Sequence, residues 1–366
     1  MKIGILSMQK VINYGSFLQA YGLRKLVRSL CACEVDFVDI IDGRELEVNK
    51  LSKNQKVLSI LKSVKDGLFF EKLNSRFYMK KIEHQFSKDF FHILELNEEN
   101  NSKHFSSVII GSDEVFHCCQ NAKWGFSTQL LGNVKNADNV FSYAASFGAT
   151  TYDDIIKNGI LNEVKGNLSK LSSISVRDEN SKFIIQKILG KTVESHLDPV
   201  LISDFENEIN LSPDVKIREK FLIVYSYAGR ITEKKEVGNI KEFAKKKELK
   251  IYTIFCRYNW ADKCIIPESP FQLLKIFRLA EYVVSDTFHG TIFSIISHRK
   301  FCTLIRKSNK EKMTSLLKSF NLEEHAVFDA DELKEKIELE IDHKVIDTIR
   351  EAEKQRSLAY IESNVR

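Results

Sequence analysis

Residues 2–41 read KIGILSMQKVINYGSFLQAYGLRKLVRSLCACEVDFVDII. The stretch begins with a short β-rich apolar run at 2–7, passes through the turn-forming Asn13-Tyr14-Gly15, and then carries apolar residues at roughly helical spacing from 16 to 30. Residues 34–41 predict a second strand. Two strands joined by one helix predict a right-handed parallel crossover, so the fold class is α/β.

The same pattern continues along the chain. In the first half, apolar runs that end in small or polar residues return at 107–110, 140–144, 173–176 and 192–196. Residues 202–219 are polar, and beyond them we predict strands, separated by helices, at 221–226, 249–255, 281–285 and 301–305. We therefore predict two Rossmann-like domains that face a central cleft, at 1–205 and 215–330, followed by a helical tail at 331–366.

A helical insertion is predicted within the first domain, from about 44 to 100, where the β signal disappears. Its part from Lys53 to Lys81 is basic and carries the aromatic pairs Phe69-Phe70 and Phe77-Tyr78. Such a segment suits an amphipathic surface for a membrane or a lipid-bearing partner. The commoner alternative is a set of helices that pack an apolar stripe on their own domain.

Composition excludes several classes of protein. The chain has 366 residues, with 55 Lys or Arg against 50 Asp or Glu, and a net charge of +5 is too dilute to indicate nucleic-acid binding. No stretch approaches about 18 uninterrupted apolar residues, and the start reads as a strand rather than a signal peptide, so we expect a cytoplasmic protein. The seven cysteines show no C-x-x-C spacing, and we expect no metal site.

The strongest local candidate for a site is the turn from Ser285 to Ser294, between a predicted strand and a predicted helix. Free backbone N–H groups at such a turn suit a phosphate or carboxylate. Gly290 permits close approach, the Thr291 hydroxyl can add a donor, and His289 is placed for proton transfer. The alternatives are that Asp286 caps the helix, Gly290 serves packing and His289 is structural.

A second candidate is the loop Asn13-Tyr14-Gly15-Ser16 between the first strand and the first helix. The loop lacks G-x-G-x-x-G and the Walker lysine motif, which disfavours a dinucleotide or triphosphate. Asn13 and Ser16 can still hydrogen-bond a sugar or anion. Alternatively, Ser16 is an N-cap and Gly15 a turn residue.

Two arginines that follow predicted strands, Arg177 and Arg230, are candidates for binding a small anion. A phosphate ester that also carries a carboxylate needs forked donors, which guanidinium supplies. Surface salt bridging is the alternative for each of them.

Six motifs occur in the order typical of polysaccharide pyruvyl transferases, and the chain resembles that family from residue 1 to about 320. They are Asn13-Tyr14-Gly15-Ser16-Phe17-Leu18-Gln19-Ala20-Tyr21, Gly111-Ser112-Asp113-Glu114-Val115-Phe116, Ala145-Ser146-Phe147-Gly148, Ser175-Val176-Arg177-Asp178, Asp198-Pro199-Val200-Leu201 and Ser285-Asp286-Thr287-Phe288-His289-Gly290-Thr291.

The resemblance implies a fold similar to that of B-type glycosyltransferases, phosphoenolpyruvate as the donor substrate with no cofactor, and a pyruvate ketal on two hydroxyls of a sugar. The family's D-[ST]-x-H-G motif maps onto Asp286 and His289 as catalytic residues, and its S-V-R arginine onto Arg177. Other motif positions are expected to bind substrate: Asn13, Gly15, Ser16, Gly111, Ser112, Asp113, Ser146, Gly290 and Thr291. Arg230 is added as a donor-binding arginine only from its position after the first strand of the second domain. The first domain would take the acceptor and the second the donor.

Two positions depart from the family pattern. Phe116 stands where members often have tryptophan, and Lys310 and Lys312 stand in a stretch where an arginine is common. The second change keeps the positive charge but loses the planar fork of guanidinium.

The resulting expectation is a pyruvyltransferase of polysaccharide, capsule or cell-envelope synthesis. It would act on a sugar or lipid-linked oligosaccharide, with possible peripheral contact with the membrane surface. Two alternatives stay open because a fold does not determine its function: a nucleotide-sugar-dependent glycosyltransferase, and a non-catalytic glycan-binding relative.

Overall fold

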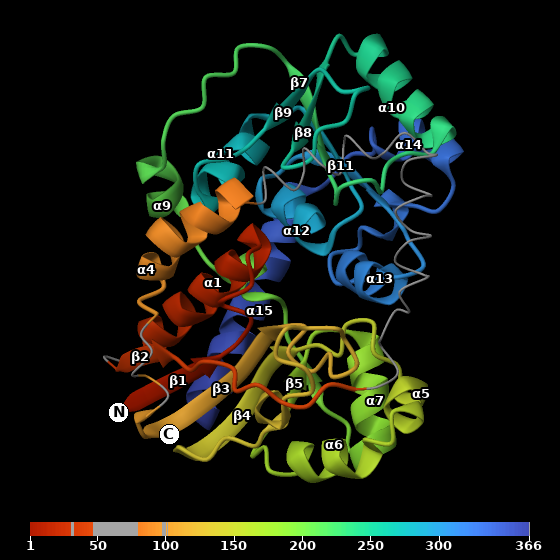
Figure 1. Ribbon diagram of the computed structural model, residues 1–366. Helices are drawn as coiled ribbons and strands as arrows, with labels where there is room; N and C mark the ends of the chain where they lie inside the picture. The colour runs from red at the N-terminus through yellow and green to blue at the C-terminus, as the bar shows by residue number, and fades with distance from the viewer. Residues whose placement is uncertain (31–32, 47–79, 97–99, 101, 366) are drawn as a thin grey trace. The chain divides into compact units, whose positions relative to one another are not determined.

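The computed structural model describes residues 1–30, 33–46, 80–96, 100 and 102–365. They form two compact units (Figure 1). The first holds the described residues among 1–50, 87–204 and 348–366, and the second holds those among 51–86 and 205–347. Most of the predicted insertion at 44–100 lies outside the described residues.

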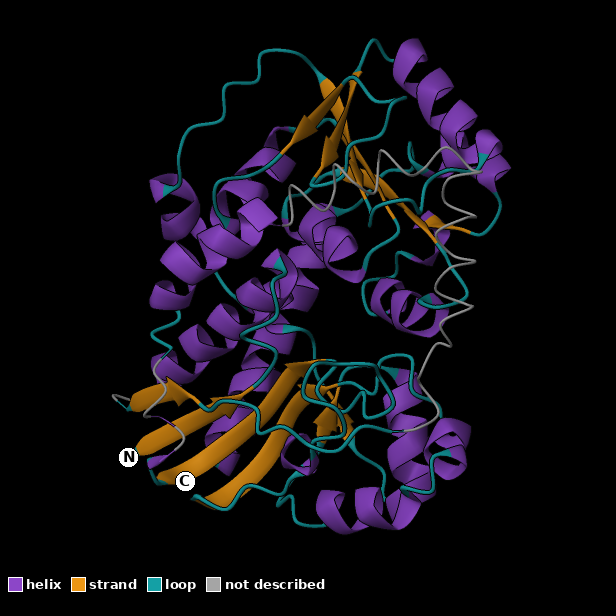
Figure 2. Cartoon of the chain, in the orientation of Figure 1, coloured by secondary structure: helices purple, strands orange, loops and turns teal. Residues whose placement is uncertain are grey.

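The first unit is built on a parallel sheet of six strands in the order β2-β1-β3-β4-β5-β6. The strands are β1 (Lys2–Leu6), β2 (Glu34–Phe37), β3 (Phe105–Asp113), β4 (Ala137–Ala145), β5 (Ser175–Val176) and β6 (Glu194–Ser195). Its α-helices are α1 (Tyr14–Leu30), α4 (Phe91–Ile93), α5 (Tyr152–Lys157), α6 (Leu161–Leu168), α7 (Glu179–Leu189), α8 (Pro199–Ile202) and the larger part of α15 (His343–Asn364). The strands appear as one layer flanked by helices in Figure 2.

The second unit repeats the plan with a parallel sheet in the order β12-β11-β10-β7-β8-β9. The strands are β7 (Phe221–Tyr225), β8 (Lys250–Ile254), β9 (Lys263–Ile265), β10 (Tyr282–Ser285), β11 (Lys300–Leu304) and β12 (Ala326–Val327). Its helices are α9 (Glu206–Leu211), α10 (Lys234–Lys246), α11 (Pro270–Leu279), α12 (Phe288–Ile296), α13 (Lys310–Lys318) and α14 (Leu333–Lys336).

The central strands are buried along almost their whole length, which explains their continuous apolar sequences. All five residues of β7 are buried, and eight of the nine residues of β3 are. An all-parallel sheet carries helices on both faces, so its strands need apolar side chains on both sides. Alternation of polar and apolar residues is accordingly weak in these strands.

Each sheet contains one point where the strand order reverses. In the first unit the reversal falls between β1 and β3, which pair with Ile5 opposite Ile109. In the second it falls between β7 and β10, which pair with Val224 opposite Val284. In open α/β sheets ligands bind beyond the carboxyl ends of the strands at such points. The residues that follow β1, β3, β7 and β10 are therefore candidates for a ligand-binding site.

The prediction of an α/β chain with two Rossmann-like domains is confirmed. The chain passes from the first unit to the second between Asp204 and Phe205, close to the predicted end of the first domain at 205. The predicted tail at 331–366 is divided between the units, because from Thr348 onward α15 packs with the first unit. There Tyr360 donates a hydrogen bond to the Ser142 carbonyl oxygen of β4 at 2.9 Å.

Candidate functional site

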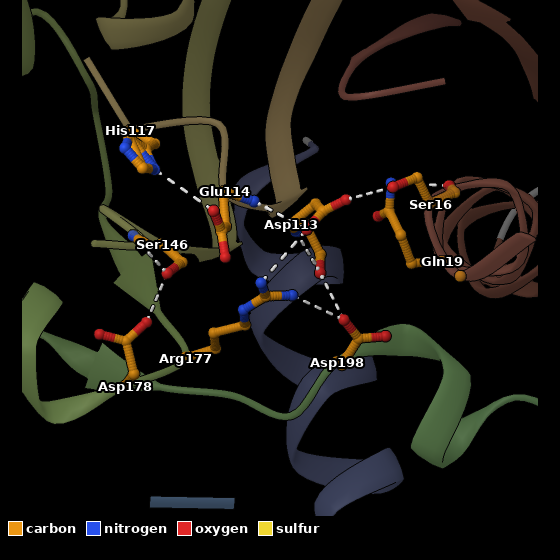
Figure 3. Close-up of polar contacts among 12 residues, drawn as sticks. Ser16, Gln19, Asp113, Glu114, His117, Ser146, Arg177, Asp178 and Asp198 are labelled. Carbon is orange, nitrogen blue, oxygen red and sulfur yellow. Dashed lines mark hydrogen bonds and ion pairs between the residues drawn. The ribbon is translucent and has the colours of Figure 1, made fainter. Parts of the chain in front are cut away.

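Arg177, directly after β5, is the centre of a buried ion-pair network in the first unit (Figure 3). Its Nη1 donates to Asp198 Oδ2 at 2.8 Å and its Nη2 donates to Asp113 Oδ1 at 3.2 Å. The Arg177 side chain is only 3% exposed, and that of Asp198 is fully buried. The network thus links the ends of β3 and β5 to the residue that precedes α8.

The charges of this network hold one another in their ionised forms. Burial lowers the pKa of Arg177, but Asp113 and Asp198 oppose this effect, and the pKa ends above its ordinary value. Removing one partner would leave the opposite charge buried without compensation, which is strongly destabilising. Loss of any one member should therefore destabilise this end of the first unit whatever ligand the unit binds.

The loop after β1 is tied to the same network. Ser16 Oγ donates to Asp113 Oδ2 at 2.8 Å, and Asn13 Oδ1 accepts from the backbone N–H groups of Gly15 and Ser16 at 2.7 and 3.4 Å. The first turn of α1 is thus capped by Asn13 rather than by Ser16. Ser16, the alternative cap, instead joins α1 to the end of β3.

Gly111 and Ser112 bring the last residues of β3 close to β4. Gly111 has a φ of +138°, and a Cβ built there would lie 2.0 Å from the Tyr143 carbonyl oxygen, so only glycine fits. The peptide bond between the two residues is cis. Ser112 Oγ accepts from the Asp113 backbone N–H at 2.7 Å and donates to Asp198 Oδ2 at 3.4 Å.

Ser146, after β4, fixes the next loop along the sheet. Its Oγ donates to Asp178 Oδ2 at 2.6 Å and accepts from the Gly148 backbone N–H at 2.9 Å. Asp178 is also the N-cap of α7, since its side chain accepts from the Ser181 N–H. The predicted residues Ser16, Ser112, Asp113, Ser146 and Arg177 thus lie at or beyond the carboxyl ends of the four adjacent strands β1, β3, β4 and β5, and they are joined by hydrogen bonds or short chains of them.

In the second unit, the predicted turn between β10 and α12 is a capped helix start. The N-cap is Thr287, whose Oγ1 accepts from the Gly290 N–H at 3.0 Å, and not Asp286 as the alternative interpretation had it. A Cβ at position 290 would lie 2.2 Å from Ser285 Oγ and 2.6 Å from Thr287 Oγ1. Gly290 is therefore required by close packing under the first turn of the helix.

Asp286 lies between two arginines at the strand-order reversal. Its carboxylate is fully buried, with Oδ2 at 3.4 Å from Arg306 Nε and 3.9 Å from Arg230 Nη1. Arg306 also binds Glu236 of α10 with both terminal nitrogens, at 2.5 and 3.0 Å. Burial raises the pKa of Asp286, and this effect is opposed by Ser226, Arg230 and Arg306.

His289 and Thr291 lie in the first turn of α12, but they point to different surroundings. The His289 ring is stacked with Phe293 at a centroid distance of 6.0 Å. Thr291 is fully buried, and its hydroxyl donates to the Thr287 carbonyl oxygen at 3.2 Å and pairs with Thr303 Oγ1 at 3.0 Å. The structure thus accounts for the Thr291 hydroxyl by internal contacts, and its predicted role toward a ligand stays a prediction.

Four charged members of these networks were not among the predicted site residues: Asp178, Asp198, Glu236 and Arg306. Asp198 belongs to the motif Asp198-Pro199-Val200-Leu201. Arg306 follows the strand β11, as Arg177 and Arg230 follow other strands. The family pattern predicts an arginine in the stretch that holds Lys310 and Lys312. In the structure Arg306, just before that stretch, supplies a guanidinium. Nothing in the sequence distinguishes Glu236 as a site residue, because it lies in a helix rich in charged residues.

Two further observations concern the described part of the chain. None of its His, Cys, Asp and Glu side chains gather in threes in a way that could hold a metal ion. Among the same residues, every helix is too short or too polar to cross a membrane.

Solved structures with a similar arrangement include enzymes that act on nucleotide sugars. The UDP-GlcNAc 2-epimerase of Methanocaldococcus jannaschii, in complex with UDP-GlcNAc and UDP, aligns at a TM-score of 0.49 with 12% identity, covering 99% of each chain. The Neisseria meningitidis UDP-GlcNAc 2-epimerase aligns at 0.47 with 10% identity, covering 100% of this chain and 94% of that one. The E. coli heptosyltransferase WaaC with ADP aligns at 0.36 with 10% identity, covering 83% and 87%.

Sequence comparison gives a more specific result. The model of the polysaccharide pyruvyl transferase family matches residues 13–308, which include every predicted site residue from Asn13 to Thr291. No curated protein sequence matches the chain significantly.

Proposed function

Because the chain belongs to the polysaccharide pyruvyl transferase family, we propose that it moves the pyruvyl group of phosphoenolpyruvate onto two hydroxyls of a sugar. The acceptor would be part of a polysaccharide or lipid-linked glycan precursor, and the product a ketal. The observation that carries this proposal is the end of β10 in the second unit. There Arg230 and Arg306 both approach Asp286, and α12, which carries His289 in its first turn, begins two residues later.

This arrangement suits a small donor that carries both a phosphate and a carboxylate. Such a molecule offers little apolar surface, so charge-assisted hydrogen bonds must supply most of its binding energy. Arg230 is 38% exposed, and its carboxylate neighbour Asp286 keeps it near the helix start. Arg306 is oriented by Glu236 and Asp286 together. Both guanidiniums and the first turn of α12 would stabilise the charge that develops on phosphate as it leaves.

The proposed chemistry begins at the methylene carbon of the donor. Protonation there makes C2 electrophilic, and a sugar hydroxyl adds to C2 as it loses its proton. Phosphate then leaves with the electron pair of its C–O bond, and a second hydroxyl of the same sugar closes the ketal. His289 transfers a proton in this series of steps, and the Asp286 carboxylate positions Arg230 and Arg306.

Residues at the strand ends of the first unit would hold the acceptor. Asn13, Gly15 and Ser16 at the start of α1 and Gly111 and Ser112 at the end of β3 lie at its strand-order reversal, and Ser146 lies in the next loop. The buried network of Asp113, Arg177 and Asp198 fixes these loops in position. We place the acceptor here because sugars are bound through hydroxyl and backbone groups of this kind.

The proposal is tested by acceptor-dependent release of inorganic phosphate from phosphoenolpyruvate, with a panel of free and lipid-linked glycosides. We expect release only when a suitable diol is present, together with a product heavier than the acceptor by one pyruvyl group. Transfer from a nucleotide sugar without phosphate release would instead identify a glycosyltransferase. Binding of glycosides with no turnover of either donor would identify a non-catalytic relative.

A further inference from the structure

The Glu114 and His117 side chains form a pair just beyond the carboxyl end of β3. His117 Nδ1 lies 3.3 Å from Glu114 Oε2, and the side chains are 15% and 27% exposed (Figure 3). A turn holds them together, since the His117 backbone N–H donates to the Glu114 carbonyl oxygen at 3.0 Å. The pair thus stands at the strand-order reversal of the first sheet and reaches solvent, unlike the Arg177 network beside it.

The neighbouring loop leaves room for this pair in a specific way. Gly148 has a φ of +57°, and a Cβ built on it would lie 2.5 Å from His117 Nδ1 and 2.6 Å from Glu114 Oε2. Its backbone is held on both sides, by Ser146 Oγ at 2.9 Å and by Asn180 Nδ2 at 3.3 Å. The imidazole and the carboxylate therefore pack directly on a fixed glycine backbone.

The position of Glu114 is also determined by the buried network. Its backbone N–H donates to Asp113 Oδ1 at 2.9 Å, and the same oxygen accepts from Arg177. Glu114 interacts electrostatically with Arg177, and Asp154 of α5 does so with His117. Arg177 and Asp154 are thus charged groups that interact with the pair from neighbouring elements.

From this geometry we propose that His117, oriented by Glu114, is the general base that takes the proton of the attacking acceptor hydroxyl, an inference that rests on the proposed pyruvyl transfer. When Nδ1–H donates to the carboxylate, Nε2 is the basic nitrogen of the ring. A histidine whose second nitrogen is held by a carboxylate is the usual device for activating a hydroxyl.

The step balances in atoms and charge. The sugar O–H bond breaks, its proton passes to His117 Nε2, and the oxygen electron pair forms a bond to C2 of the donor. The methylene carbon of the donor takes a proton from a separate acid, for which His289 is the proposed group. The imidazolium returns its proton to solvent, and phosphate leaves with the electrons of the broken C–O bond. The second sugar hydroxyl then adds to C2 and gives its proton to the released phosphate, which closes the ketal.

Two other histidines of the first unit, His196 and His104, illustrate what a structural role looks like. His196 is fully buried, with Nδ1 at 2.6 Å from Ser175 Oγ, and burial lowers its pKa to about 3. His104 pairs with Asp138 at 2.8 Å, but the side chains are 64% and 71% exposed, and the pair lies at the amino end of β3. Among these three histidines, His117 alone is both partly exposed and located at the carboxyl end of the sheet.

The decisive variants are His117→Asn and Glu114→Gln, with His104→Asn as the matched control at the opposite end of β3. We expect His117→Asn to lower kcat by about 10²- to 10⁴-fold, the range for loss of a general base, and to leave the affinity for phosphoenolpyruvate unchanged in calorimetry. Glu114→Gln should have a smaller effect on kcat and should shift the acid limb of the pH–rate profile to lower pH. His104→Asn should behave as the wild type.

Two results would overturn the inference. One is a His117→Asn protein that keeps wild-type turnover and the acid limb of its pH–rate profile. If the wild type releases no phosphate with any acceptor, the proposed function itself fails, and the second result comes from a binding experiment on His117. His117 is then tested by its NMR resonance during titration with methyl glycosides of galactose, glucose and mannose. The spectrum of His117→Asn, which lacks this resonance, assigns it. A resonance that shifts on titration supports a sugar site at the pair, and an unmoved resonance ends the proposal.

Discussion

His289 stands in the first turn of α12 beside the proposed donor site, and its loss should affect chemistry rather than folding. We expect His289→Ala to lower turnover by about two to four orders of magnitude, because a group that transfers a proton contributes about that much. The matched control is His298→Asn, just beyond the other end of the same helix, where His298 has a φ of +54° that asparagine tolerates. Its Nε2 lies 3.0 Å from Asp347, away from the helix start. Near-normal turnover in a folded His289→Ala protein would exclude His289 from the mechanism.

Arg177 and Arg230 should differ in what their removal does. Arg177→Ala leaves Asp113 and Asp198 buried without their partner, and we expect it to lower the free energy of unfolding by about 3–5 kcal/mol in urea denaturation. Arg230 is partly exposed and stacks on Tyr227, so Arg230→Ala should cost about 1 kcal/mol or less. Equal losses of stability in the two variants would contradict the assignment of the buried network.

Binding of the donor is measured in the variants that fold. Arg230→Ala should weaken binding of phosphoenolpyruvate by more than about 1.5 kcal/mol, the lower end for hydrogen bonds to a charged group. Arg177→Lys keeps the charge in the first unit and tests whether Arg177 also contributes to donor binding. Unchanged donor affinity in both would place the donor elsewhere.

Asp286 should make stability depend on pH in an unusual direction. Burial raises its pKa in the folded protein, so folding favours the protonated form, and stability falls as the pH rises from the ordinary aspartate value through the raised one. We expect Asp286→Asn to unfold at a higher temperature than the wild type at pH 7 and at the same temperature near pH 3, below the ordinary aspartate pKa of about 3.9. Donor affinity should fall, because Arg306 loses a charged partner. A variant less stable at pH 7 would show that pairing with the arginines outweighs the cost of burial.

At the scale of elements, the start of α12 depends on one hydroxyl. Thr287 Oγ1 satisfies the Gly290 N–H, and removal of such a cap costs about 0.5–2 kcal/mol. We expect Thr287→Ala to lower the free energy of unfolding by that amount and to weaken donor binding, since the first turn carries the anion-binding N–H groups. Thr287→Ser, which keeps the hydroxyl, is the control and should retain both properties. A stable Thr287→Ala protein with normal donor affinity would show that the cap is dispensable.

At the scale of the whole molecule, we propose that the basic segment from Lys53 to Lys81 brings the enzyme to a lipid-linked acceptor. Its eight positive charges are opposed by two acidic residues, and most of the segment lies outside the described residues. Each basic residue near an anionic surface is worth about 1 kcal/mol, and the attraction is screened within about 10 Å at 0.1 M salt. We expect co-sedimentation with phosphatidylserine vesicles at low salt, weaker binding at high salt, and none with neutral vesicles.

A charge-matched pair of variants sharpens this test. Replacing four lysines of the segment by glutamine should abolish sedimentation with vesicles: Lys53, Lys56, Lys62 and Lys65. The control replaces four exposed lysines of α10 in the second unit and should bind as the wild type does: Lys234, Lys241, Lys245 and Lys246. Equal binding by both variants, or no binding by the wild type, would end the membrane proposal and leave pyruvyl transfer unaffected.

Much of the fold was predictable because it is encoded locally. The strands β1, β7, β10 and β11 and the helix α1 lie within a few residues of their predicted positions, since each is a continuous apolar run or a helical repeat. The strands β9 and β12 were not predicted. They have three and two residues at the two edges of the second sheet, which is too short to give a periodic signal.

The sequence by itself determined the two Rossmann-like units, the family and the turns that carry His289 and Arg177, because motifs and periodicity need only neighbouring residues. The tertiary structure decided which charges meet. Arg177 is 64 residues from Asp113, and Arg306 is 70 residues from Glu236, so their pairing depends on the order in which strands lie in a sheet. The same holds for Glu114 and His117, whose place at the strand-order reversal appears only when β3 is set beside β1. A buried charge must find its partner in space, and no local pattern records where that partner lies.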